Sequence, residues 1–198
     1  MPSSPLVEAD LLARLRGRDP DALTSVVREH TRPLFRAARG MGLAEDAAED
    51  LVQDVLTTFL STLNRFEGRS QVGTWLFGIL HKKIFEYRRG RARDERNDSI
   101  DDVFESRFDS QGNWTQPPAD LDRLLESKEA GVLIQGCLEH LPESQRAAFT
   151  LREIQDLDTP EICEILGISS SNFGVLMHRA RSHLRECLEG HGVTSAGH

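Results

Sequence analysis

The chain of 198 residues has few cysteines, no long apolar run and no strand-like alternation, and each shortage excludes a class of protein. Because no apolar run reaches about 18 residues and no secretory segment is evident, we expect no membrane insertion and a cytoplasmic location. The three cysteines, Cys137, Cys163 and Cys187, are odd in number and far apart, which fits a reducing compartment. No nucleophile–base arrangement, phosphate-binding loop or acid pair indicates an enzyme, and we expect no cofactor or metal.

Apolar residues recur at helical rather than strand spacing almost throughout the chain. An early helix is expected to kink or end at Pro33, with His30 as a satisfied, half-buried histidine. Residues 65–73 are expected to form a loop, followed by another helix. The strongest predicted helix covers residues 44–63, where one broad face is apolar: Ala48, Leu51, Val52, Val55, Leu56, Phe59, Leu60 and Leu63. The sequence therefore predicts an all-α fold.

Charge is unevenly distributed along the chain, although its net value of −8 looks unfavourable for a nucleic-acid binder. Residues 81–96 hold seven Lys or Arg against three acids, whereas residues 97–129 hold nine acids against three basic residues. A basic helix followed by an acidic, proline-containing stretch predicts a domain boundary with a solvated linker. The predicted parts are a small helical domain, a flexible acidic linker, a second small helical domain and a tail: 1–96, 97–123, 124–190 and 191–198.

Residues 159–188 have the pattern of a helix-turn-helix. Thr159 is expected to cap a first helix with Pro160 at its first position, and Gly167 can adopt the left-handed conformation that ends it. Ser169 is expected to cap a longer second helix, whose buried stripe is Phe173, Leu176, Met177, Ala180 and Leu184. The basic residues of this second helix are Arg179, Arg181 and Arg185. Such a unit lays a helix in the major groove of DNA, and a tight helical corner of another kind is the alternative.

The basic run at 81–93 lies close to several aromatic residues, namely Trp75, Phe77, Phe85 and Tyr87. Lys and Arg neutralise phosphates and aromatic rings stack on exposed bases, a combination that suits single-stranded DNA. Trp75 and Tyr87 also lie on an apolar stripe, so packing in the core is the alternative for these two. Contact with DNA is the favoured interpretation of the run as a whole.

Three aspartates, Asp46, Asp50 and Asp54, lie in one row of the predicted 44–63 helix. Such a row is usually a solvated face, and three aspartates on a single helix do not converge on a metal ion. No His or Cys lies among them. A protein-docking surface is therefore the better functional alternative.

Taken together, these segments resemble a bacterial RNA polymerase sigma factor of the extracytoplasmic-function (ECF) type. The similar stretches are Ala48-Glu-Asp-Leu-Val-Gln-Asp-Val, Gly73-Thr-Trp-Leu-Phe-Gly-Ile, Leu141-Pro-Glu-Ser-Gln-Arg-Ala-Ala-Phe and His178-Arg-Ala-Arg-Ser-His-Leu-Arg. They occur in the family's order, and the resemblance covers residues 20–95 and 124–188. It implies a region 2-like domain over 1–96 and a region 4-like domain over 124–190.

The resemblance implies three binding surfaces and three partners: core RNA polymerase (clamp and flap), promoter DNA and an anti-sigma factor. The polar face of the 44–63 helix would dock on the clamp through Asp46, Asp50, Gln53, Asp54 and Thr57. The −10 element would be recognised and opened through Arg69, Thr74, Lys82, Lys83, Tyr87, Arg88, Arg89 and Arg91. The −35 element would be read through Ser169, Ser170, Ser171, Asn172, Val175, His178, Arg179 and Arg181. The acidic linker would thread toward the active cleft of the polymerase.

The start of the recognition helix departs from the family pattern. Many relatives begin it with a Thr-Val-Lys-Ser-Arg-like sequence, whereas this chain has Asn172-Phe173-Gly174-Val175-Leu176 and lacks the Lys and Arg. Base readout is therefore expected to rely on Ser170, Ser171 and Asn172, and on contact of Val175 with a thymine methyl group. These residues do not specify one −35 sequence.

Two other functions are consistent with parts of the sequence. A stand-alone transcriptional regulator would use the same helix-turn-helix, but as a dimer that binds duplex DNA without polymerase. A metal- or redox-sensing helical protein would use Cys137 with His140, and His183 with Cys187. Cysteines at such helix positions more often fill core space as small hydrophobes.

Overall fold

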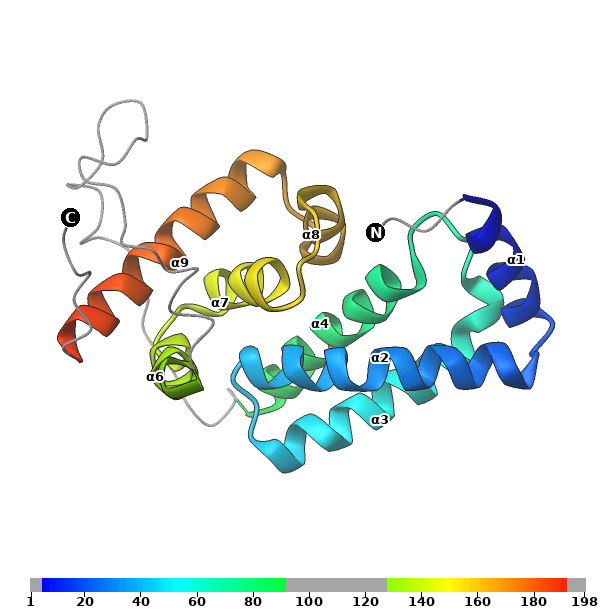
Figure 1. Ribbon diagram of the computed structural model, residues 1–198, viewed down its shortest axis with the longest axis horizontal. Coiled ribbons are helices and arrows are strands. Elements are labelled where there is room, and N and C mark those ends of the chain that lie inside the picture. Colours follow the sequence, from blue (N-terminus) through cyan, green and yellow to red (C-terminus); the bar gives the residue numbers. More distant parts are fainter. Residues whose placement is uncertain (1–4, 92–127, 192–198) are drawn as a thin grey trace.

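The computed structural model describes residues 5–91 and 128–191, and every regular element in these ranges is helical (Figure 1). The N-terminal half consists of α1 (Pro5–Arg16), α2 (Pro20–Gly40), α3 (Glu45–Thr62), a 3-10 turn η1 (Leu63–Arg65) and α4 (Val72–Arg91). The C-terminal half consists of α6 (Lys128–Glu139), α7 (Glu143–Phe149), a π-helical turn η3 (Thr150–Ile154), α8 (Thr159–Leu166) and α9 (Ser170–Gly190). The all-α expectation is confirmed, and the predicted linker at 97–123 lies outside the described residues.

Helix α2 continues through Pro33 to Gly40, so the proline does not end the helix. Leu34, Ala37 and Ala38, which follow the proline, are completely buried. A proline inside a helix costs about 3 kcal/mol, but burying the next helical turn against α3 and α4 offsets that cost. Tertiary packing therefore overrides the local stop signal.

Helix α3 has the amphipathic character that its sequence predicts. Its buried residues are Ala48, Val52, Val55 and Phe59, and all of them belong to the predicted apolar face. The ring of Phe59 meets Trp75 of α4 edge-on, with 5.5 Å between ring centroids. On its other side Trp75 stacks on Phe66, with 4.6 Å between centroids. These aromatic contacts fix α3 against the start of α4.

The helix-turn-helix is confirmed, with one change at its start. Asp158, not Thr159, is the N-cap of α8: its carboxylate accepts the backbone N–H of Glu161, whose side chain in turn accepts the backbone N–H of Asp158. This reciprocal pair satisfies two free amides and therefore outcompetes a threonine cap. Gly167 ends α8 with φ of +66°, and Ser169 caps α9 by accepting the backbone N–H of Asn172.

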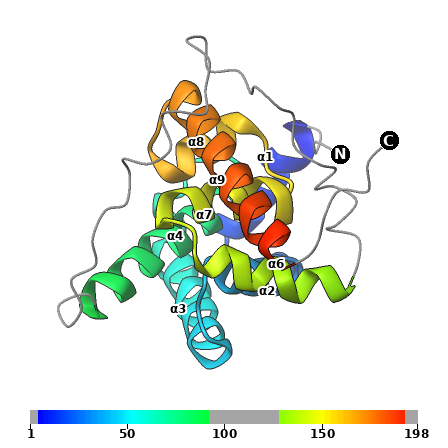
Figure 2. The same ribbon diagram turned by 90° about the vertical axis from the view of Figure 1, so that its left-hand side faces the viewer.

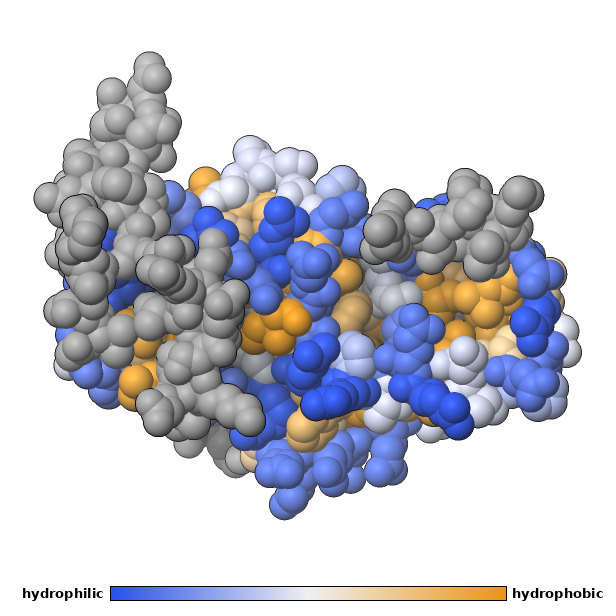
Figure 3. Space-filling model, in the orientation of Figure 1, coloured by the Kyte–Doolittle hydropathy of each residue, from blue (hydrophilic) through white to orange (hydrophobic). Residues whose placement is uncertain are grey.

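The two halves of the chain lie against each other, with α4 next to α8 and the end of α2 next to η3 (Figures 1 and 2). Their buried apolar residues form one continuous cluster rather than two separate cores. On the face seen in Figure 3, apolar side chains occur as separate patches among hydrophilic ones. None of the helices in the described ranges has both the length and the apolar character needed to cross a membrane.

Candidate nucleic-acid and protein-docking surfaces

The outer face of α3 carries the predicted polymerase contacts. Asp46, Asp50, Gln53 and Thr57 are all exposed. Asp54 is different, because its carboxylate forms an ion pair with Lys83 of α4, with 2.5 Å between Oδ2 and Nζ. Sequence reasoning had assigned these two residues to separate surfaces, but the packing of α3 on α4 brings them together.

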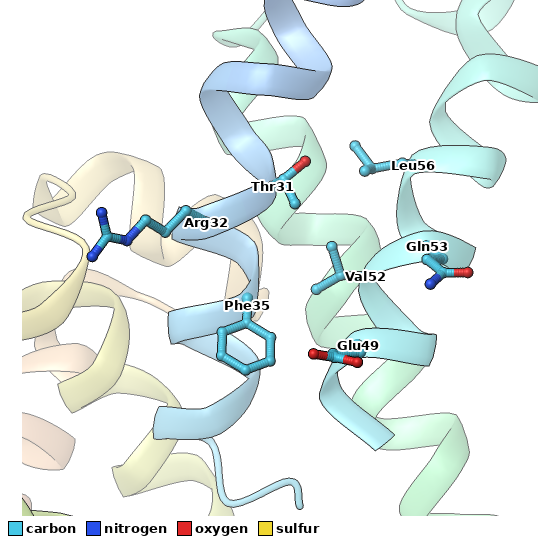
Figure 4. Close-up of a pocket in the computed structure, with 7 residues that line it drawn as sticks. All are labelled: Thr31, Arg32, Phe35, Glu49, Val52, Gln53 and Leu56. Carbon is cyan, nitrogen blue, oxygen red and sulfur yellow. The ribbon is translucent and has the colours of Figure 1, made fainter. Parts of the chain in front are cut away.

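A pocket of about 360 Å³ lies between α2 and α3, beside the exposed polar residues of α3 (Figure 4). Its lining residues are Thr31, Arg32, Phe35, Glu49, Val52, Gln53 and Leu56. Phe35, Val52 and Leu56 give it an apolar interior, and polar side chains stand at its edges. Such a combination suits a protein side chain better than a free ion. Sequence reasoning found Gln53 but missed Phe35, because only the packing of α2 on α3 brings that ring next to these polar residues.

A second pocket, of about 330 Å³, lies between α3 and α4. It is lined by Thr58, Thr62, Arg65, Trp75, Ile79, Lys82, Lys83 and Glu86. Arg65 and Lys82 are exposed there, whereas Lys83 is paired with Asp54 and Glu86 adds a negative charge. Basic side chains beside a large ring suit a phosphate and a base of single-stranded DNA. Trp75 packs on Phe66, as the core alternative expects, and it also lines this pocket, whereas stacking on a base stays a prediction.

Phe85 and Val175 are the two large hydrophobic residues that stand out by exposure among the described residues, each 47% exposed. Phe85 lies on α4, where the guanidinium of Arg89 sits 5.7 Å from the centroid of its ring. Val175 lies on α9, the predicted recognition helix. Single exposed apolar residues are common on protein surfaces, so exposure by itself assigns neither residue a role. Phe85 was named in the basic helix but not among the predicted contacts.

Two predicted −10 contacts face the C-terminal half instead of solvent. Thr74 is only 3% exposed, and its hydroxyl donates a hydrogen bond of 2.6 Å to Glu161 of α8. Arg88 forms an ion pair of 3.1 Å with Glu143 of α7 and also donates to the carbonyl of Met41. In this arrangement the C-terminal half covers Thr74 and engages Arg88, so contact of either side chain with the −10 element stays a prediction.

The remaining predicted −10 residues differ in their surroundings. Lys82 and Arg89 are exposed on α4, and Tyr87 is half-buried there. Arg69 is exposed in the loop before α4 and pairs with Glu67 at 2.8 Å. Arg91 ends α4, and its side chain lies outside the described part of the structure. Lys82 and Arg89 therefore offer the accessible positive charge of this surface.

The predicted −35 residues gather at the start of α9. Ser169, Ser170, Ser171 and Asn172 are all exposed at its N-terminus. The Ser169 hydroxyl accepts the Asn172 backbone N–H and bonds to the Ser171 hydroxyl. A helix N-terminus with exposed hydroxyl and amide groups can meet a phosphate or a base edge.

Farther along α9, Arg181 is exposed but ion-paired, and the other two −35 candidates are less accessible. Arg181 pairs with Glu153 at 2.6 Å, and His178 and Arg179 are half-buried. Burial, with a smaller effect of Arg179, lowers the pKa of His178. At neutral pH this histidine therefore presents a neutral ring rather than a positive charge.

Both histidines of the two cysteine–histidine alternatives contact other groups. His140 contacts the carbonyl of Gly136 through Nδ1, and His183 contacts Gln145. Instead Cys137 of α6 is bonded to Cys187 of α9. The expectation of three separate cysteines is thus corrected, because packing of α6 on α9 joins two residues that are 50 positions apart.

The chain is similar to known proteins over both halves. Residues 26–94 match sigma-70 region 2, and residues 132–184 match sigma-70, region 4. A probable RNA polymerase sigma factor of Haemophilus influenzae is 34% identical over 150 residues, which are 72% of this chain and 77% of that protein. The ECF RNA polymerase sigma-E factor of Escherichia coli is 28% identical over 132 residues, 67% of this chain and 69% of that protein.

A solved structure has the same fold. It is the sigma factor RpoE of Bartonella quintana, crystallised with the anti-sigma factor NepR, and it is 24% identical with a TM-score of 0.64. The match covers 84% of this chain and 96% of that one. Both sigma-70 regions match this chain in the family's order, and a relative is 34% identical over 72% of it. The chain therefore belongs to the sigma-70 family of RNA polymerase sigma factors, in the ECF group.

Proposed function

We propose that this sigma factor docks on core RNA polymerase through α3 and the adjoining pocket, and reads promoters with α4 and the start of α9. The observation that carries the proposal is the helix-turn-helix, whose second helix begins with exposed polar residues in the stretch that matches sigma-70, region 4. The positions of Phe85 and Val175 are consistent with it. Both are exposed, and each lies on one of the two helices that would face DNA. The basic and aromatic pocket between α3 and α4 supports the assignment of the −10 element to this half.

We propose the cytoplasm, where core polymerase transcribes, as the place of action, and an anti-sigma factor as a partner. The relative from Bartonella quintana was crystallised with such a partner, and it shares the fold. In the present chain the halves already cover part of each other, through Thr74 with Glu161 and Arg88 with Glu143. A third contact runs from the Gln135 amide to the carbonyl of Arg39, at 2.9 Å. Core polymerase would have to separate the two halves of this chain in order to bind them. A sequestering partner would prevent the chain from reaching core polymerase.

Removing polar groups from the docking face should weaken polymerase binding without unfolding the chain. We expect the double variant Asp50→Ala, Gln53→Ala to lower the affinity for core polymerase by about tenfold, or about 1.4 kcal/mol. Both side chains are exposed, so helix α3 should keep its packing. Competition with a labelled wild-type chain for core polymerase measures the change. Asp10→Ala, which removes an exposed acid of α1 away from both pockets, is the matched control. Undiminished affinity in the double variant would reject this docking face.

Substitutions in the two proposed DNA-binding surfaces should have different effects on transcription. The variant Lys82→Ala, Arg89→Ala should slow open-complex formation at every promoter, because phosphate contacts position DNA without reading its sequence. Asn172→Ala should instead change preference among −35 sequences by about 1–3 kcal/mol. The Asn172 amide that bonds to Ser169 belongs to the backbone, so the cap survives the substitution. Transcription from a set of −35 variants distinguishes the two effects, and a sequence-selective defect in both variants would contradict the assignment.

A further inference from the structure

Two cysteines and a histidine meet where α6 crosses the end of α9. Cys137 is completely buried on α6, and Cys187 is half-buried near the end of α9. Their Cα atoms are 5.8 Å apart, and the two sulfurs are bonded. His191 stands one helical turn after Cys187, and its ring nitrogen and the two sulfurs lie within 4.8 Å of one another. The third cysteine, Cys163 on α8, is free and half-buried.

We propose that Cys137 and Cys187 form a reversible thiol–disulfide site that responds to peroxides, with His191 accepting the first proton. Cys187 is the more accessible of the two sulfurs and has the exposed imidazole beside it, which favours its reactive thiolate. Cys137 is shielded from solvent, which suits it to the second step, attack on an oxidised Cys187. The arrangement thus contains one accessible thiol, one proton acceptor and one resolving thiol.

The oxidation proceeds in two balanced steps. The Cys187 thiolate attacks one oxygen of hydrogen peroxide and the O–O bond breaks. The protonated His191 returns its proton to the departing oxygen, so that sulfenic acid and one water form. The Cys137 thiol then attacks the Cys187 sulfur, an S–S bond forms, and the sulfenic oxygen leaves with the thiol proton as a second water. The two thiols together lose two electrons, and the peroxide gains them. A dithiol reductant reverses the change by thiol–disulfide exchange.

Oxidation would stabilise the C-terminal half as a unit. The bond joins the first helix of that half to the far end of the recognition helix, across 50 positions of sequence. A cross-link over such a long loop restricts the unfolded chain much more than the folded one. Because α6 also holds the N-terminal half through Gln135, the oxidised chain should keep its halves together more firmly.

The test uses the full chain, reduced and then treated with hydrogen peroxide. We expect the intact mass to fall by two hydrogens, peptide mapping to find Cys137 joined to Cys187, and the unfolding midpoint to rise by roughly 10 °C. Cys163→Ser should behave like wild type, whereas Cys187→Ser should lose both the bond and the rise. His191→Gln should reach the same oxidised product several-fold more slowly at neutral pH.

Several outcomes would overturn the proposal. One is a disulfide that includes Cys163, and another is an unfolding midpoint that is the same in the reduced and oxidised wild-type chains. A third concerns zinc added to the reduced chain. Stoichiometric zinc that survives gel filtration, protects the thiols from peroxide and is lost in His191→Gln would make this a metal site rather than a redox site. If Cys187→Ser fails to fold, the rate in His191→Gln still decides, because that side chain is exposed.

Discussion

The isolated chain is expected to bind promoter duplex no more tightly than about 1 μM at physiological salt, which is the range of non-specific binding. Its net charge of −8 opposes long-range attraction to DNA. Thr74 and Arg88, which lie on α4, the helix proposed to face DNA, are engaged by the C-terminal half. With core polymerase, the same duplex should be bound at about 10 nM or tighter, a gain of about a hundredfold or more.

Gel shifts with and without core polymerase measure this difference directly. A duplex with scrambled −10 and −35 elements is the control, since it keeps the phosphates and removes the sequence. The holoenzyme should prefer the intact promoter, and the isolated chain should barely distinguish the two duplexes. Nanomolar, sequence-specific binding by the isolated chain would instead identify a stand-alone regulator.

The substitution Gly40→Leu should separate the two halves. Gly40 ends α2 at the junction with η3, and a Cβ built there would lie 2.8 Å from Cγ2 of Thr150 and 3.1 Å from Cδ1 of Ile154. Thr150 is completely buried, so it has little room to move. Overpacking of this kind costs about 1–3 kcal/mol, which changes the ratio of closed to open chains by about 5- to 150-fold. Leucine favours helix, so α2 itself should survive.

Small-angle X-ray scattering gives the dimensions of the variant in solution, and circular dichroism checks that its helices remain. We expect a larger radius of gyration and unchanged helicity. Gly78→Leu is the matched control, because a Cβ added at Gly78 in α4 meets no atom within 4 Å. A compact Gly40→Leu chain with wild-type dimensions would show that this junction does not hold the halves together. The open variant should also bind promoter DNA more tightly than the wild-type chain does.

Local features of this fold could be predicted wherever a short stretch of sequence determines them. The apolar face of α3 follows from its 3.6-residue period, and Gly167 and Ser169 mark the turn because of their own conformational preferences. The N-cap of α8 is Asp158, one residue before the predicted Thr159. The sequence contains the signal for it, because Asp158 stands three residues before Glu161, as a capping box requires.

Contacts between distant residues could not be predicted, because periodicity shows which face of a helix is apolar but not what covers the polar face. Thr74 and Glu161 are 87 positions apart, and nothing near either one indicates the other. The same holds for Lys83 and Asp54, which the charge pattern assigned to two different surfaces. The sequence thus identifies candidate binding residues, but whether their side chains are accessible to DNA or polymerase depends on how the two halves pack.

In-vitro transcription with core RNA polymerase over a library of genomic promoters tests the central claim most directly. Adding this chain should produce transcripts from a set of promoters that share two spaced elements. Scrambling either element should abolish those transcripts. No transcription above that of core polymerase alone, or transcripts that start without regard to any shared pair of elements, would contradict the account.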